Sequence, residues 1–203
     1  MLRYYIIHKP YKVTSRFTST PDQPGLNEYF KVPKDVYAVG RLDQDSEGLL
    51  LLTNDKRINN LLLHPDHQHE REYLVQVDGD ITTAACSTIE KGVVITVNGK
   101  SYHTKPCGVR RCTKPDWVAE RLPPVRFRKN IPTSWISITL TEGKNRQVRK
   151  MTAAAGFPTL RLIRIRIGRL TLDHLEPGAI RELSARECYA AIEQPDRKNG
   201  KRS

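Results

Sequence analysis

A short segment of this basic chain places four acidic residues beside a run of four leucines. The segment is YAVGRLDQDSEGLLLLTND, residues 37–55, and its acids are Asp43, Asp45, Glu47 and Asp55. Asp55 stands where a helix is expected to begin, so it is predicted to cap that helix. The composition around Asp45 and Glu47 is typical of a tight turn. Asp43 follows a strand directly, where rigid sheets present catalytic groups, so it is either a turn residue or a catalytic carboxylate.

The segment EGKNRQVRKM, residues 142–151, could supply a cationic partner for such a carboxylate. On a helix that begins near Asn145, the side chains of Arg146, Arg149 and Lys150 fall at three- and four-residue spacing and form one cationic face. Such a face can bind phosphates from solvent. Alternatively, one of these arginines points inward, pairs with an acid and orients it.

The overall charge favours a nucleic acid as the partner. The chain has 34 lysines and arginines against 22 aspartates and glutamates, which gives a formal net charge of +12. The resulting positive field suits phosphate backbones. No basic amphipathic helix with exposed Trp or Phe favours a membrane surface, no apolar run is long enough to cross a bilayer, and no signal peptide is indicated. We therefore expect a cytoplasmic protein without a membrane partner.

Neither a metal ion nor another cofactor is expected. His103, Cys107 and Cys112 could be read as a ligand cluster, but their spacing matches no standard tetrahedral zinc site. The four cysteines are instead expected to be reduced and mostly buried thiols. The chain contains neither a G-x-G-x-x-G motif nor a P-loop, so a nucleotide cofactor is not indicated.

The elements that would position these residues are mostly strands. The predicted strands are 4–10, two segments flanking the acidic turn, 72–79, a hairpin over 93–102 around Asn98-Gly99, 134–143 and 159–172; the predicted helices are 55–65, 81–92, 145–156 and 184–194. In 159–172 the apolar positions change parity, which predicts a bulge or kink near Leu162. Strands linked by hairpins indicate an α+β fold with a largely antiparallel sheet.

Five motifs in order give the chain a resemblance to a known family. GRLDQDSEGLLLLTND resembles the central motif of the RsuA-type pseudouridine synthases, which isomerise uridine to pseudouridine in ribosomal RNA. HKPYKV, REYLVQV, EGKNRQVRKM and LIRIRIGRLTLDHLEPGAIREL resemble the other motifs of that family. In HKPYKV, His8 and Lys12 stand where the family pattern has asparagine and glycine. The similarity covers residues 4–183.

The resemblance implies a role for each of nine residues. Asp43 is similar in position to the essential catalytic aspartate, Tyr73 to the tyrosine that stacks near the target base, and Arg149 to the basic residue that ion-pairs the aspartate. The residues implied to bind RNA are Arg41, Lys144, Arg146, Lys150, Leu162 and Arg164. Within this set, Arg41 would help to displace the flipped nucleotide and Leu162 would line the pocket.

The resemblance also implies a substrate and an architecture. The substrate is expected to be a uridine of 23S ribosomal RNA, with large-subunit RNA or its assembly precursor as the partner of a monomer. Small-subunit or transfer RNA is the alternative substrate, and a non-catalytic RNA-binding module is the alternative function. The expected fold is an α+β, largely antiparallel mixed-sheet pseudouridine synthase fold with two lobes around a central catalytic cleft. Residues 1–190 would form this domain, without an N-terminal S4-like domain, and 191–203 a basic tail.

Overall fold

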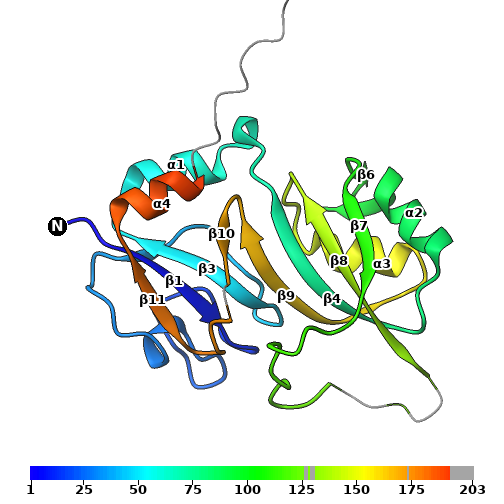
Figure 1. Cartoon of the computed structure of the whole chain (residues 1–203), viewed down its shortest axis with the longest axis horizontal. Coiled ribbons are helices and arrows are strands. Elements are labelled where there is room, and N and C mark those ends of the chain that lie inside the picture. The colour runs from blue at the N-terminus through cyan, green and yellow to red at the C-terminus, as the bar shows by residue number, and fades with distance from the viewer. Residues whose placement is uncertain (126–127, 129–130, 173, 193–203) are drawn as a thin grey trace, which may run out of the picture.

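The computed structural model describes residues 1–125, 128, 131–172 and 174–192, and a mixed sheet of nine strands dominates it (Figure 1). The strands of this sheet are β1 (Tyr4–Lys9), β2 (Tyr37–Ala38), β3 (Glu47–Thr53), β4 (Arg71–Asp78), β7 (Gly108–Cys112), β8 (Thr133–Leu140), β9 (Thr159–Ile167), β10 (Leu170–Thr171) and β11 (Ile180–Leu183). A separate hairpin consists of β5 (Val94–Val97) and β6 (Lys100–His103). The helices are α1 (Lys56–Leu63), α2 (Thr83–Lys91), α3 (Gln147–Ala154) and α4 (Ala185–Ile192), with short 3-10 turns at Leu26–Glu28 and Pro65–His67.

The sheet consists of two antiparallel halves that meet at one parallel pair. The order is β11-β1-β3-β9-β4-β8-β7, with β2 beside β3 and β10 beside β9. Every pairing between these strands is antiparallel except that of β3 with β9, where Glu47 lies opposite Ile163 and Gly48 opposite Arg164. The predicted α+β fold with a largely antiparallel mixed sheet is confirmed.

The two faces of the sheet are covered differently. On one face, α1 and α4 pack across the junction on apolar side chains from β1, β3, β4 and β9. The other face carries two groups: α2 and α3 on β4, β8 and β9, and residues 13–36 on β1 and β3. The leucine run shows this division. Leu49 and Leu51 pack on the face covered by α1 and α4, while Leu50 and Leu52 pack against residues 13–36 on the other face. A strand buried on both faces reads as a continuous apolar run.

Local signals placed several elements correctly. The hairpin turn falls at Asn98 and Gly99, whose φ angles of 50° and 76° are those that an Asn-Gly turn favours. Asp55 caps α1 by accepting a backbone N–H bond from its first turn. Ser184 and Glu187 form the expected capping box before α4.

The long strand predicted over 159–172 is interrupted. β9 ends at Ile167, and Gly168, with φ 56°, turns the chain into β10. The register between β9 and β4 shifts twice, past Leu160 and past Ile165. Two irregularities therefore flank the position at which a single kink was expected. The change of parity has a second cause, because Leu162 and Ile163 pack on opposite faces of the sheet.

Among the described residues, no helix combines the length and the apolar character that a membrane span needs. Within the same residues, no group of three or more His, Cys, Asp or Glu side chains could hold a metal ion. The four cysteines are free thiols, of which Cys86 and Cys188 are buried. Of the predicted basic tail, residues 191–192 complete α4, and residues 193–203 lie outside the described residues.

Candidate active site

Asp43 lies on the loop that leads into β3, and the N-terminal segment holds the backbone of this loop. The Ser15 hydroxyl donates a hydrogen bond to the Leu42 carbonyl (2.8 Å) and accepts one from the Leu42 N–H (3.0 Å). The Lys12 N–H donates to the Gln44 carbonyl at 2.8 Å. Asp43 is thus flanked on both sides by residues whose backbone is fixed.

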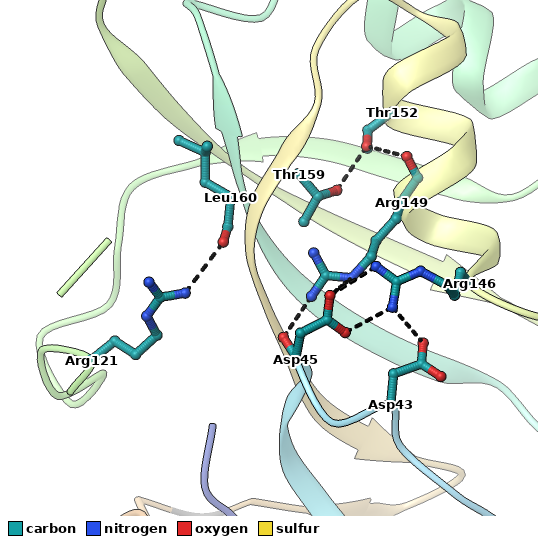
Figure 2. A network of polar contacts seen from close by, with 8 residues as sticks. All are labelled: Asp43, Asp45, Arg121, Arg146, Arg149, Thr152, Thr159 and Leu160. Carbon is teal, nitrogen blue, oxygen red and sulfur yellow. Dashed lines mark hydrogen bonds and ion pairs between the residues drawn. The ribbon is translucent and has the colours of Figure 1, made fainter. Parts of the chain in front are cut away.

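The Asp43 carboxylate is partly exposed and faces a cation from the start of α3. Its side chain is 38% exposed, and its Oδ2 lies 3.8 Å from Nη1 of Arg146. The Arg146 guanidinium also donates to both carboxylate oxygens of Asp45, at 2.9 and 2.8 Å. Figure 2 shows Arg146 between the two aspartates. Arg146 is therefore the cation that joins Asp43 to the rest of the site.

Arg149 contacts Asp45, whereas the resemblance implied an ion pair with Asp43. Its Nη2 donates to the Asp45 carbonyl at 2.6 Å, and its Nε lies 3.4 Å from the Asp45 Oδ2. Burial alone would raise the pKa of the Asp45 carboxyl, but the Arg146 hydrogen bonds and the two arginine charges outweigh it and lower the pKa. Arg149 thus anchors the loop two residues beyond Asp43 (Figure 2).

The helix face predicted to carry Arg146, Arg149 and Lys150 is not formed, because Arg146 lies outside the helix. α3 begins at Gln147, and Arg146 precedes it in the left-handed conformation, with φ 53°. A non-glycine residue rarely adopts this conformation, so helical spacing could not predict the direction of the Arg146 side chain. Instead of lying side by side on a helix, Arg146 and Arg149 converge on Asp45.

A pocket of about 550 Å³ opens beside this loop, between the two halves of the sheet. Seven of the nine predicted site residues line it: Arg41, Asp43, Tyr73, Lys144, Arg146, Leu162 and Arg164. Arg149, which contacts Asp45, and Lys150 are outside the lining. Because residues of both halves meet here, the predicted arrangement of two lobes around a cleft is present.

Tyr73 and Arg164 lie on neighbouring strands at the pocket. They are opposite one another in the β4–β9 pairing, next to the register shift between Glu72 and Tyr73. Arg164 is only 5% exposed, and its Nε donates to the Leu49 carbonyl at 2.8 Å. The residue predicted to bind RNA is therefore a buried cation of the pocket and not a surface contact for phosphates.

A polar group on the far side of the pocket was not predicted. The Glu142 carboxylate accepts hydrogen bonds from the Tyr102 hydroxyl (2.5 Å), the Lys105 N–H (2.9 Å) and the Gln147 amide (2.6 Å). The Lys144 ammonium lies 4.8 Å from the centre of the Tyr102 ring. Tyr102 and Lys105 belong to no motif, and only their place in a basic β-rich segment could have drawn attention to them.

Lys9 is a buried lysine behind the acidic loop. Its side chain is fully buried, and its ammonium donates to the carbonyls of Pro10 (2.9 Å) and Val13 (2.6 Å). Burial lowers the pKa of Lys9 to about 7, against the opposing charges of Glu47, Asp45 and Asp43.

This shift predicts a pH dependence of stability. An unfolded lysine has a pKa of about 10.4, so between about pH 7 and that value the unfolded chain binds the extra proton. The free energy of unfolding should therefore rise with pH in this window, by up to about 1.4 kcal/mol per unit from this residue. Urea unfolding at about pH 7.5 and pH 9.5 should show that Lys9→Met loses this part of the rise, while the exposed control Lys100→Met keeps it. Parallel curves for wild type and Lys9→Met would contradict the prediction.

Comparison with known proteins identifies the family. Residues 3–154 match the family model described as RNA pseudouridylate synthase. The chain belongs to this family. The resemblance inferred from the five motifs is thereby confirmed, and with it the expectation of an RNA-modifying isomerase.

Relatives and a solved structure agree with membership of the RNA pseudouridylate synthase family. The chain is 46% identical over 188 residues to ribosomal large subunit pseudouridine synthase E of Xanthomonas campestris pv. campestris, covering 92% of this chain and 98% of that protein. It is 47% identical over 178 residues to the protein of the same name from Vibrio parahaemolyticus, covering 88% and 72%. A crystal structure of a pseudouridylate synthase superposes with a TM-score of 0.74 at 27% identity, covering 95% of this chain and 74% of that one. The pseudouridine synthase fold is confirmed.

Proposed function

We propose that this protein isomerises a specific uridine of large-subunit ribosomal RNA to pseudouridine, as a monomer in the cytoplasm that acts on 23S RNA or an assembly precursor. The relatives that share 46–47% of the sequence and bear that name support the choice of RNA. The observation that carries the proposal is the shared pocket of Asp43 and Tyr73, which come from segments on opposite sides of the β3–β9 junction.

Binding begins with the RNA backbone. The net charge of +12 attracts phosphates, and Arg41, Lys144 and Arg146 place cations around the mouth of the pocket. A uridine inside a base-paired or stacked segment cannot reach Asp43, so the target nucleotide has to flip out of the stack first. Leu162 offers an apolar wall for the flipped base.

The isomerisation conserves every atom of the nucleotide. The bond between N1 and C1′ breaks, the ring turns, a bond forms between C5 and C1′, and a proton leaves C5 while N1 gains one. No electron acceptor or external energy source is needed. The Asp43 carboxylate stabilises the positive charge that develops at C1′, and Arg146, 3.8 Å away, balances the negative charge of Asp43 in the free enzyme.

Tyr73 completes the machinery. Its ring offers a flat face on which the base can stack, and its hydroxyl can take part in moving the proton from C5. A module that only binds RNA would have no use for a carboxylate and a tyrosine that line one pocket. This argument favours an enzyme over the alternative of a non-catalytic RNA-binding module.

The test combines a cellular and a purified assay. Mapping pseudouridines in total RNA from cells with and without the gene should show the loss of a large-subunit site. Purified protein should release tritium from large-subunit RNA labelled at C5 of uridine. If the pseudouridine that disappears lies in small-subunit or transfer RNA, that RNA is the substrate in place of the proposed one. Unchanged pseudouridine in all RNA would refute the function.

The two neighbouring cations of α3 should behave differently when each is replaced by alanine. Arg149→Ala removes the hydrogen bond to the Asp45 carbonyl, so the loop shifts and turnover should fall about 100-fold. Lys150→Ala should mainly weaken RNA binding and reduce the slope of log affinity against log salt by about 1. Tritium release and filter binding at several salt concentrations measure both effects, and identical behaviour of the two variants would contradict the assignment.

A further inference from the structure

Arg164 carries a buried charge that has no acidic partner among the described residues. The residue is only 5% exposed to solvent, and its Nη2 is buried without a hydrogen-bond partner. Its Nε–H donates a hydrogen bond to the Leu49 carbonyl and the Tyr73 side chain is its other polar neighbour, so the described residues offer no carboxylate to compensate the charge. An arginine keeps its charge in proteins, so this residue places a fixed positive charge inside the molecule.

Arg161, three residues earlier in β9, is a buried arginine outside the pocket lining and serves for comparison. Arg161 is 3% exposed, and both Nε and Nη2 bind the Glu47 carboxylate, at 2.8 and 2.9 Å. Removal of a charge from water costs several kcal/mol unless a partner compensates it. Arg161 has that partner within the protein, whereas the described residues around Arg164 provide none within ion-pairing distance.

The position of Arg164 connects it to the reaction. It lies opposite Tyr73 of β4 and opposite Gly48 of β3, and it lines the same pocket as Asp43. Burial lowers the pKa of its guanidinium, and the contact with the Tyr73 side chain works against that shift. The unpaired cation therefore borders the space into which the flipped base would enter.

We propose that Arg164 stabilises the uracil ring while this ring carries negative charge, and that it orients the Tyr73 hydroxyl toward the same ring. This inference rests on the proposed function. When the N1–C1′ bond breaks, both of its electrons stay on the uracil and the charge spreads over N1, O2 and O4. The ring then uses C5 to form the new bond to C1′, loses the C5 proton and takes up a proton at N1. A preorganised cation in a pocket with little water stabilises such a transient anion strongly.

The test compares two substrates that differ in how well the detached ring holds negative charge. Target RNA is prepared with uridine or with 5-fluorouridine, whose fluorine withdraws electrons and stabilises the anion. The first-order rate at which the N1–C1′ bond of the target nucleoside is lost is measured in single turnover for wild type, Arg164→Met and Arg164→Lys. This step precedes the loss of the C5 proton, which 5-fluorouridine does not carry. Arg166→Met serves as the control, because Arg166 lies in the same strand, pairs with Glu70 and Glu72, and is outside the pocket lining.

Arg164→Met should consume uridine about 100-fold more slowly than wild type, with little change in RNA affinity. The loss should shrink by about tenfold or more on 5-fluorouridine, because the better leaving group depends less on the missing charge. Arg164→Lys should retain more activity than Arg164→Met, and Arg166→Met should stay within a few-fold of wild type. Far-UV circular dichroism and the melting temperature show whether each variant folds. If Arg164→Met does not fold, the comparison of the two substrates is made with Arg164→Lys.

A loss that is equal on both substrates would overturn this inference and leave the proposed function standing, because a misplaced strand slows both substrates alike. Inactivity of the wild-type protein on every RNA tested would remove the proposed function and the inference together. The activity of the wild-type protein therefore distinguishes the two failures.

Discussion

Replacement of Asp43 by asparagine is expected to abolish isomerisation while leaving the fold and the RNA affinity in place. The side chain is 38% exposed and makes one ion pair, at 3.8 Å, so the loss of its charge disturbs little of the packing. The amide cannot stabilise positive charge at C1′ or form a bond to it, and turnover should fall by about 10⁴-fold or more.

Tritium release from labelled ribosomal RNA measures this loss, and a binding assay on the same RNA shows that the substrate still docks. Asp22→Asn makes the same chemical change at an exposed position outside the pocket lining and should behave as wild type. Measurable turnover by Asp43→Asn at a tenth of the wild-type rate would show that the reaction does not depend on this carboxylate.

The second large effect is expected at the buried ion pair of Glu47 and Arg161, next to the loop that carries Asp43. Both side chains are 3% exposed, and Arg161 also donates to the Ala119 carbonyl at 2.9 Å. Glu47→Gln leaves a buried guanidinium without its counter-charge, which should lower the free energy of unfolding by about 3–5 kcal/mol. For a chain of this size, the melting temperature should fall by roughly 6–20 °C.

Thermal and urea unfolding test this, with Glu182→Gln as the matched control. Glu182 pairs with Arg3 at 2.7 Å, but both side chains are exposed, so this variant should lose less than about 1 kcal/mol. The double variant Glu47→Met with Arg161→Met should be more stable than Glu47→Gln, because no buried charge is left unpaired. Equal small losses for Glu47→Gln and Glu182→Gln would contradict the prediction.

The sequence predicted what neighbouring residues determine. Asp55 as a helix cap, the turn at Asn98-Gly99 and the capping box before α4 each depend on a few adjacent residues, and all three are present. The strand predicted to end directly before Asp43 is shorter than expected, because β2 ends at Ala38 and Asp43 lies in the loop before β3. Seven of the nine expected site residues line one pocket, and four of the five motifs supply them.

The partners within the site could not be read from the sequence in this way. Whether Arg149 binds Asp43 or Asp45 depends on a shift of two residues, and the left-handed φ of Arg146 that brings both arginines to Asp45 has no signal in composition or spacing. Glu47 and Arg161 are 114 residues apart. The resemblance named Arg164 as a contact for RNA, but its burial and its place opposite Tyr73 depend on how β9 pairs with β4.

The junction of β3 with β9 also limits the stage of synthesis at which the pocket can form. Tyr73 leaves the ribosome about 90 residues before Arg164, a delay of roughly 5–20 seconds at ordinary translation rates. Until β9 has emerged, β3 lacks its parallel neighbour and the floor of the pocket does not exist. A nascent chain that has not yet released β9 therefore cannot form the complete pocket that Asp43 and Tyr73 share.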